Sequence, residues 1–445
     1  MSGTGARWAV ERAVAACRSA EGCVAIADDI SSAHLRWAGN ALTTNGFTRT
    51  QRLTVIAVAG DAAGVVAREG GLDRDSVAEL VQAAECAARL AGPAPDAAPL
   101  PTGDGRDPPG WSDPPAETTF ARLHPFITGL THLFDDARQH GRELYGYAEQ
   151  QVRTTYLAST TGLRLRHRQP TGILDLTAPA GHGTPAWTGL SVPDLTQVRI
   201  AAPDTGPTRT VDLPPGRYEV LLPPSAVADL MIHLYRAAAA ADTHTVFGDG
   251  TRLGERLTEA PLTLYGDPHE PGLECAPFAI ARSFAADASV FDNGTPLRRT
   301  EWITGGVLTS LVRTRSTAGA TGLPHTPMID NLVLSGPGGR TLADMIAGTR
   351  RALLPTSLWY LRDVEPRTLL LTGVTRDGVL LIEDGEITGR VPDFRFNESP
   401  VALLDRVTEA GRTERTLPRE WGDYFTRTAM PPLRIADFAV SAFLR

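Results

Sequence analysis

The alternation of apolar and polar residues predicts a small first unit in which two helices cover several strands. Apolar residues recur at helical spacing over residues 6–20 and 73–90, which are therefore predicted helices. Between them lie segments typical of strands, residues 22–27, 34–37, 46–58 and 65–67. Asn45-Gly46 favours a tight hairpin turn. Residues 1–92 are expected to form a small αββα layer.

A segment rich in proline, glycine and aspartate, residues 93–116, predicts a linker or an exposed loop. A middle strand-rich region, residues 117–216, follows it and begins with a helix expected over residues 126–140. Polar and apolar residues then alternate as in antiparallel strands, over residues 145–149, 152–159, 163–169 and 172–178. Turns are expected at Thr161-Gly162 and at Pro170-Thr171-Gly172.

The last part of the chain, residues 217–445, is predicted to be mostly strand around one central helix. Its expected strands are residues 217–222, 262–265, 279–284, 298–303, 306–311, 331–335, 368–374, 378–383 and 386–391. Short helices are expected over residues 341–352 and 400–410. Many strands with few helices are typical of a curved or barrel-like domain. The expected fold class is α+β, with an N-terminal αββα layer and a strand-rich, barrel-like C-terminal domain.

The central helix follows Pro223-Pro224, with Ser225 as the expected N-cap and an alanine run, residues 237–241, as its extension. A zinc-binding helix needs two histidines on one face and a glutamate that acts on the metal-bound water. Here His233 stands alone, and Asp229 lies one turn before it on the same face. One carboxylate and one imidazole make half a metal site, so a core or interface histidine is the favoured interpretation.

Composition narrows the function classes. The formal net charge of −8 argues against a general nucleic-acid binder, which needs basic charge to displace phosphate counterions. The chain contains no lysine, which excludes Schiff-base chemistry and, with its many alanines and prolines, is typical of a GC-rich bacterial genome. No signal peptide or membrane-spanning segment is predicted. The four cysteines lack CxxC spacing, so reduced thiols in a cytoplasmic protein are expected.

Several motifs occur in the order found in one known family. They are RYEVLL at residues 217–222, FDNGTPLRRT at 291–300, WITGGVL at 302–308, DNLVL at 330–334, TLADMI at 341–346 and DFRFN at 393–397. With these motifs, residues 217–445 resemble the TldD/PmbA (TldE) family, and the N-terminal unit resembles it more loosely. The resemblance implies two kinds of subunit, because TldD-type chains carry HExxxH on the central helix and TldE/PmbA-type chains lack the metal ligands.

The resemblance also implies a role. The two subunit types pair, and the complex cleaves peptides, including leader or precursor peptides and unfolded chains. This chain departs from HExxxH, so it resembles the TldE type. We therefore expect no catalytic residue, metal ligand or cofactor in this chain, zinc in a TldD-type HExxxH partner, and a peptide as substrate. Neither nucleic acid nor a membrane is an expected partner.

A possible peptide groove or subunit interface involves Arg395, Asn397, Asn331 and His233. Arg395 and Asn397 alternate with Phe394 and Phe396, so they share one face of an extended segment. That face either caps a loop or lines a peptide groove.

Two other hypotheses remain open at this point. The chain could be a homo-oligomeric binding protein that does not take part in proteolysis. It could also be an enzyme with a separate site at Cys275 or at the loop histidines His244, His269 and His325.

Overall fold

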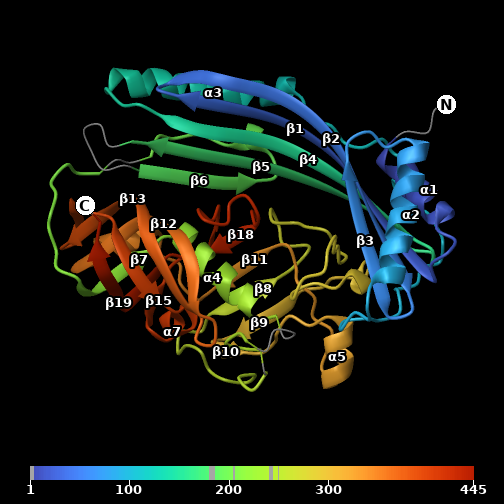
Figure 1. Cartoon of the computed structure of the whole chain (residues 1–445). Helices are drawn as coiled ribbons and strands as arrows, with labels where there is room; N and C mark the ends of the chain where they lie inside the picture. Colours follow the sequence, from blue (N-terminus) through green and yellow to red (C-terminus); the bar gives the residue numbers. More distant parts are fainter. Residues whose placement is uncertain (1–4, 180–185, 204–205, 240–243, 249, 445) are drawn as a thin grey trace.

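The computed structural model describes residues 5–179, 186–203, 206–239, 244–248 and 250–444. A long curved sheet forms one layer, and the C-terminal half of the chain lies beneath it as a barrel and a second sheet (Figure 1). Among the described residues, no helix combines the length and the apolar character needed to cross a membrane.

The large sheet has the strand order β3-β2-β1-β4-β5-β6 in the described part of the chain, and every neighbouring pair is antiparallel. Its strands are β1 (Gly22–Ala38), β2 (Ala41–Ala59), β3 (Ala62–Glu69), β4 (Tyr145–Ser159), β5 (Arg164–Ala178) and β6 (Ala186–Val192). The strands expected in residues 1–92 and in residues 117–216 therefore lie in one sheet, because β4 pairs with β1 along most of its length.

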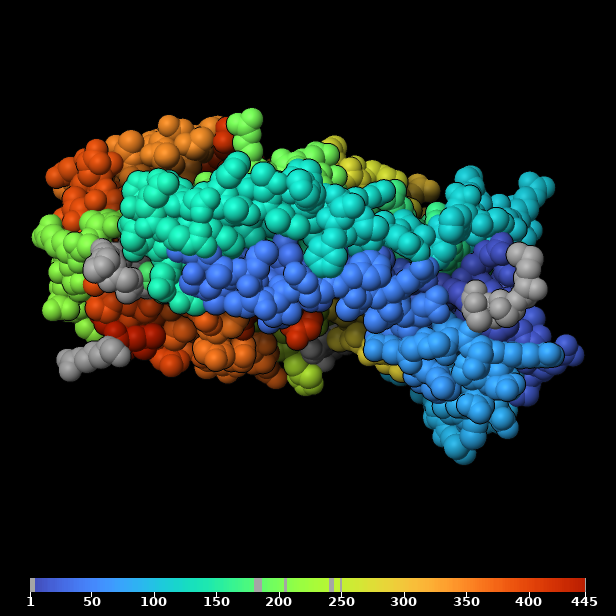
Figure 2. Space-filling model, turned by 90° about the horizontal axis from the view of Figure 1, so that it is seen from above, coloured from blue at the N-terminus to red at the C-terminus, as the bar shows by residue number. Residues whose placement is uncertain are grey.

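Three helices cover one face of this sheet. Helices α1 (Ala6–Ala16) and α2 (Arg74–Leu90) pack on one end, and α3 (Phe120–Gln139) packs on the other. Figure 2 shows α3 lying along this covered face. Asp73 caps α2 by accepting a hydrogen bond from Ser76 N–H, 2.9 Å away. The helices bury alternate residues of β1 and β4, which leaves the intervening residues on the opposite face.

Two expected turns are wrong, because long-range pairing overrides local turn preference. Asn45-Gly46 lies inside β2, and the hairpin is at Gly39-Asn40, whose φ angles are 57° and 61°. Gly46 faces His34, and a Cβ there would come within 2.5 Å of the His34 ring. Similarly, residues 170–172 continue through β5 in register with β4.

The segment 93–116 has neither helix nor strand in the structure, yet it is packed against the sheet. Leu100 and neighbouring alanines contact the apolar cluster around Ile26 and Leu157. The Trp111 side chain is 1% exposed, its ring lies 5.3 Å from Tyr156, and its Nε1–H donates to Glu11 over 2.8 Å. The segment therefore belongs to the same layer as the sheet.

Five strands close a barrel in the C-terminal half, which confirms the expected barrel-like domain. They are β7 (Gly216–Leu222), β19 (Leu433–Phe443), β15 (Phe394–Glu398), β13 (Leu370–Glu383) and β12 (Arg351–Glu365). The ring closes because β12 pairs with β13 on one side and with β7 on the other. Strands β14 (Glu386–Val391) and β16 (Val407–Ala410) extend it.

A second sheet of the described residues has the order β10-β9-β8-β11-β18-β17. Its strands are β8 (Thr263–Gly266), β9 (Thr300–Thr304), β10 (Val307–Leu308), β11 (Leu332–Ser335), β17 (Glu414–Thr416) and β18 (Thr428–Met430). The short helices nearby are η1 (Leu195–Gln197), η2 (Val290–Asp292), α5 (Arg315–Thr321), α6 (Leu342–Ala347) and α7 (Pro400–Asp405).

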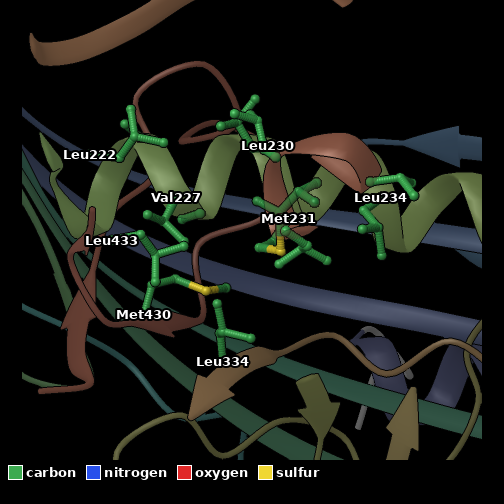
Figure 3. Close-up of a cluster of buried hydrophobic side chains, with 14 of the residues drawn as sticks. Leu222, Val227, Leu230, Met231, Leu234, Leu334, Met430 and Leu433 are labelled. Carbon is green, nitrogen blue, oxygen red and sulfur yellow. The ribbon is translucent and has the colours of Figure 1, made fainter. Parts of the chain in front are cut away.

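Helix α4 (Pro224–Ala237) is the predicted central helix, and all its residues except His233 and Arg236 are buried. Its apolar side chains contact those of β7, β11, β18 and β19 in the largest core cluster (Figure 3). The expected N-cap was wrong: Pro223 holds that position without a side-chain bond, and Ser225 lies in the first turn. The helix ends at Ala237, and residues 240–241 of the alanine run lie outside the described residues.

Other boundaries in this half also differ. Residues 279–284 form no strand, and the helices expected over 341–352 and 400–410 end at Ala347 and Asp405. The two strands expected over residues 368–383 are one strand, β13. The sequence patterns also missed β12 and β19, whose burial depends on closure of the barrel.

Candidate functional site

A cleft of about 900 Å³ lies between the uncovered face of the large sheet and loops of the C-terminal half. Odd-numbered residues of β4 and β5 line it, because successive side chains of a strand point to opposite faces, and even-numbered residues of these strands pack under the helices. From β4 these are Tyr147, Glu149, Gln151, Arg153 and Thr155, and from β5 they are His167, Gln169, Thr171, Ile173 and Asp175.

Helix α4 holds one wall of this cleft, the segment 417–427. The Asp229 carboxylate accepts hydrogen bonds from the backbone N–H groups of Arg419, Glu420 and Trp421, at 3.1, 3.0 and 3.2 Å. Burial raises the pKa of Asp229, and these three hydrogen bonds act in the opposite direction. His233 packs edge-on against Trp421, with ring centroids 5.2 Å apart. Asp229 and His233 of the helix therefore both contact the cleft wall.

These residues do not fit a zinc site. Both carboxylate oxygens of Asp229 already accept backbone hydrogen bonds. His233 Nε2 is buried and has no hydrogen-bond partner among the residues that the structure describes. Its Nδ1 lies 3.9 Å from Asp363 Oδ1, and burial lowers the pKa of this histidine. Across the described part of the chain, no three His, Cys, Asp or Glu side chains form a group that could hold a metal ion.

Arg419 joins the two layers at one end of the cleft. Its guanidinium contacts Asp175 of β5 at 2.6 Å and Asp377 of β13 at 3.3 Å. It also stacks over the rings of Trp187 and Trp359, at 4.9 and 5.3 Å from their centroids. Burial raises the pKa of Asp175, and the charge of Arg419 opposes that shift.

Further along the cleft, two arginines are paired. Arg282 donates to Asp28 of β1 through Nε and Nη2, at 2.9 and 2.7 Å. Arg427 binds Asp330 at 2.7 Å. Arg153 of β4 faces both pairs, and burial lowers the pKa of its guanidinium. Unlike Arg282 and Arg427, Arg153 has a buried Nε that finds no hydrogen-bond partner in the described structure.

The four residues expected at a groove or interface do not line this cleft. Phe394 and Phe396 of β15 are buried and Arg395 and Asn397 are exposed, as their alternation predicted, but they lie on the outside of the barrel. Asn331 is fully buried: its amide donates to the carbonyl oxygens of Asp267 and Leu273, and its Oδ1 accepts from Asp267 N–H. Asn331 thus stabilises the loop that contains Asp267 and Leu273. His233 packs behind the cleft wall.

Other candidates are dispersed. The Cys275 side chain is buried, and burial, with the nearby charge of Asp330, raises its pKa to about 12, which disfavours the reactive thiolate. His325 lies 3.3 Å from Asp292, which also binds Arg315. His269 is exposed in a loop. The structure does not bring Cys275 and these histidines into one constellation.

The residues that line the cleft were missed at the sequence level. A usable signal was present in the sequence, because residues 149, 151, 153 and 155 are all polar. In the structure the residues between them are buried. A strand with one buried face and a continuous polar row is typical of a half-exposed sheet. Residues of the C-terminal half lie opposite this polar row. The local sequence pattern does not predict their position relative to the sheet.

Comparisons with known proteins agree with this architecture. TldE from Thermococcus kodakarensis superposes with a TM-score of 0.78 at 16% identity, over 98% of this chain and 100% of that one. A putative modulator of DNA gyrase from Bacteroides thetaiotaomicron gives 0.76 at 15%, over 98% of each chain. Another from Thermotoga maritima gives 0.73 at 16%, over 97% and 98%. At these identities the likeness concerns the fold.

Sequence comparison carries the family assignment. No curated protein sequence matches the chain at a significant level. The family profile described as the PmbA/TldA metallopeptidase C-terminal domain matches residues 215–442, which is more than half of the chain and includes α4 and the barrel. The chain therefore belongs to the PmbA/TldD family of metallopeptidase-like proteins.

Proposed function

We propose that this chain is a non-catalytic, TldE-type subunit of a two-component metallopeptidase. One observation carries the proposal. On the central helix, Asp229 and His233 hold the segment 417–427 in place and do not form a metal site. The Asp229 carboxylate and the His233 ring thus stabilise the cleft wall.

The partner in this proposal is a TldD-type chain that carries HExxxH, binds zinc and hydrolyses the peptide. A zinc ion supplies an activated water at neutral pH when it is bound there. The present chain contributes a wall of the chamber and a surface that orients the substrate. A cleft of about 900 Å³ is large enough for several residues of an extended peptide. The likeness to a protein named TldE supports this assignment.

The test is to purify the chain alone and together with a TldD-type protein from the same source. Light scattering gives the stoichiometry, elemental analysis gives the zinc content, and an unfolded casein serves as substrate. We expect no zinc and no cleavage from the chain alone, and about one zinc per pair with cleavage from the complex. Substituting the HExxxH glutamate of the partner by glutamine is the control, and it should abolish cleavage while the complex persists.

Three results would contradict the proposal. Stoichiometric zinc in the isolated chain would place a metal site in it. Stable self-association with no complex would favour a stand-alone binding protein. Cleavage by the isolated chain that is lost in a Cys275→Ser or His325→Gln variant would identify an independent enzyme.

A further inference from the structure

Arg153 stands apart from the other arginines of the cleft. It is half-buried on β4, at the floor of the cleft, and its Nε is buried without a hydrogen-bond partner among the described residues. No carboxylate of that part of the chain forms an ion pair with it. A guanidinium that is largely removed from water and lacks a counter-ion is costly, so its presence requires an explanation.

The residues beside Arg153 cannot serve as its partner. On the neighbouring strands, Ile30 and Gln169 lie directly opposite it. Ile30 is apolar. The side-chain amide of Gln169 is already engaged, because its Oε1 lies 2.9 Å from His167 Nε2 and its Nε2 donates to the carbonyl oxygen of Glu274 over 3.0 Å. The neighbouring residues that the structure describes thus offer no acceptor to this guanidinium at the cleft.

The two carboxylates whose charge acts on Arg153, Asp28 and Asp330, are bound to other groups. Asp28 accepts from Nε and Nη2 of Arg282 and from the Thr155 hydroxyl at 2.6 Å. Asp330 accepts from Arg427, whose other arm donates to Thr171 over 2.9 Å. Of the three arginines Arg153, Arg282 and Arg427, only Arg153 therefore lacks a carboxylate partner among the described residues.

From this geometry we infer that Arg153 binds a carboxylate group of the peptide that enters the cleft. The planar guanidinium fork matches a carboxylate, which can accept two parallel hydrogen bonds. Its entry would give Arg153 a counter-ion, and Arg282 and Arg427 would remain on their own partners. The carboxylate belongs either to the C-terminus of the peptide or to an Asp or Glu side chain. The inference rests on the proposed role of the cleft in holding peptides.

The binding test uses the full chain and three unlabelled, acetylated apolar hexapeptides in isothermal titration calorimetry. The first has a free C-terminal carboxylate, the second is its C-terminal amide, and the third is the amide with one internal glutamate. We expect one or both of the carboxylate peptides to bind more tightly than the plain amide, with an affinity that falls as salt is raised. Which of the two binds identifies the source of the carboxylate.

Arg153→Gln should weaken binding of the carboxylate peptides by about tenfold to a hundredfold, while binding of the plain amide stays the same. Arg153→Lys keeps the positive charge but not the planar fork of the guanidinium. Its affinity for the carboxylate peptides should lie between those of the native chain and of Arg153→Gln. Arg122→Gln is the matched control: Arg122 is exposed on α3, the helix that packs on the opposite face of the sheet, and its loss should leave binding unchanged. Arg153→Gln should melt at the same temperature as the native chain or above it, because it removes an uncompensated charge.

Equal binding of all three peptides, no binding of any, or native affinity in Arg153→Gln would each overturn the inference. These results are separable from failure of the proposed function. If the complex forms and contains zinc while Arg153→Gln binds the carboxylate peptides normally, the carboxylate subsite is refuted and the subunit role is supported. If no complex forms while Arg153 is needed for carboxylate binding, the carboxylate subsite is supported and the subunit role is refuted.

Discussion

The carboxylate of Asp229 accepts a hydrogen bond from the backbone N–H of Trp421, with Oδ1 3.2 Å from the nitrogen. The two residues are far apart in the sequence, and the bond links the central helix to the wall of the cleft. With the bonds from Arg419 and Glu420, it satisfies three successive N–H groups of a segment that has no regular structure.

Asp229→Ala should therefore destabilise the fold more than a surface substitution. It leaves three backbone donors without their acceptor, and we expect a loss of about 3 kcal/mol in the free energy of unfolding, partly offset because a buried charge is also removed. Urea denaturation measures this quantity. Asp363→Ala is the control, because that carboxylate is 54% exposed and should change stability by less than about 0.5 kcal/mol. Equal losses in the two variants would contradict the anchoring role of Asp229.

Arg419 should matter for the contact between the layers. Arg419→Gln removes the ion pairs with Asp175 and Asp377 and leaves two poorly solvated carboxylates near each other. Because the Arg419 side chain is only 13% exposed, we expect a loss of about 2 kcal/mol in urea denaturation. Arg362→Gln removes a pair with Glu420 in which the arginine is 62% exposed, and it should cost less than about 1 kcal/mol. If the Arg362 variant were the less stable one, the bridging role of Arg419 would be refuted.

The cysteines should differ sharply in reactivity. The pKa of Cys275 is raised to about 12 by burial, so almost no thiolate is present at neutral pH. Cys86, by contrast, is exposed on α2. Brief treatment with iodoacetamide at pH 7.5, followed by peptide mass spectrometry, should modify Cys86 and leave Cys275 intact. In urea both should react. Rapid labelling of Cys275 in the folded chain would reopen its candidacy as a nucleophile.

Glu85 should contribute a pH-dependent part of the stability. Burial alone would raise its pKa, but hydrogen bonds from Ser19 and Arg18 outweigh burial and lower the pKa to about 2. A carboxylate whose pKa is lowered by folding stabilises the fold above its unfolded pKa of roughly 4.5, and this stabilisation is lost as the pH falls towards 2.

The measurement is the difference in unfolding free energy between the native chain and Glu85→Gln. We expect about 1 kcal/mol at pH 7, since solvent screens this largely accessible group, and a smaller difference at pH 3.5. Glu79→Gln is the control: Glu79 lies on the exposed face of the same helix, 3.5 Å from Arg68, and its loss should cost less than about 0.5 kcal/mol at pH 7. A Glu85 effect that grows on acidification would have the wrong sign.

Much of the fold could be predicted because local patterns are strong where one face of an element is buried. The α2 periodicity, the strand before α4 and the alternation of Phe394 and Phe396 with polar neighbours all appear in the structure as expected. The Asn45-Gly46 turn was wrong because pairing between β1 and β2 continues through it. Turn preferences are worth little against a ladder of hydrogen bonds along a long sheet.

The site was less accessible to prediction. His233 and Asp229 drew attention through their helical spacing, yet their partners, Trp421 and the backbone of residues 419–421, come from a distant segment. Asn331 was expected at a groove or interface, but its side-chain amide donates its hydrogen bonds to the backbone of a loop. Spacing indicates which side chains share a face, but hydrogen-bond partners are decided by segments that the chain folds against it.

The sequence by itself determined the family resemblance, the central helix without HExxxH, and a strand-rich second half, because motifs and periodicity are local properties. Only the tertiary structure decided that the N-terminal and middle strands form one sheet and that β12 and β13 close the barrel. It also decided that Arg153 lines the cleft without a carboxylate partner in the described part of the chain. The physical reason is that these features depend on pairing and burial between residues far apart in the chain, whose positions are set by closure of the whole fold.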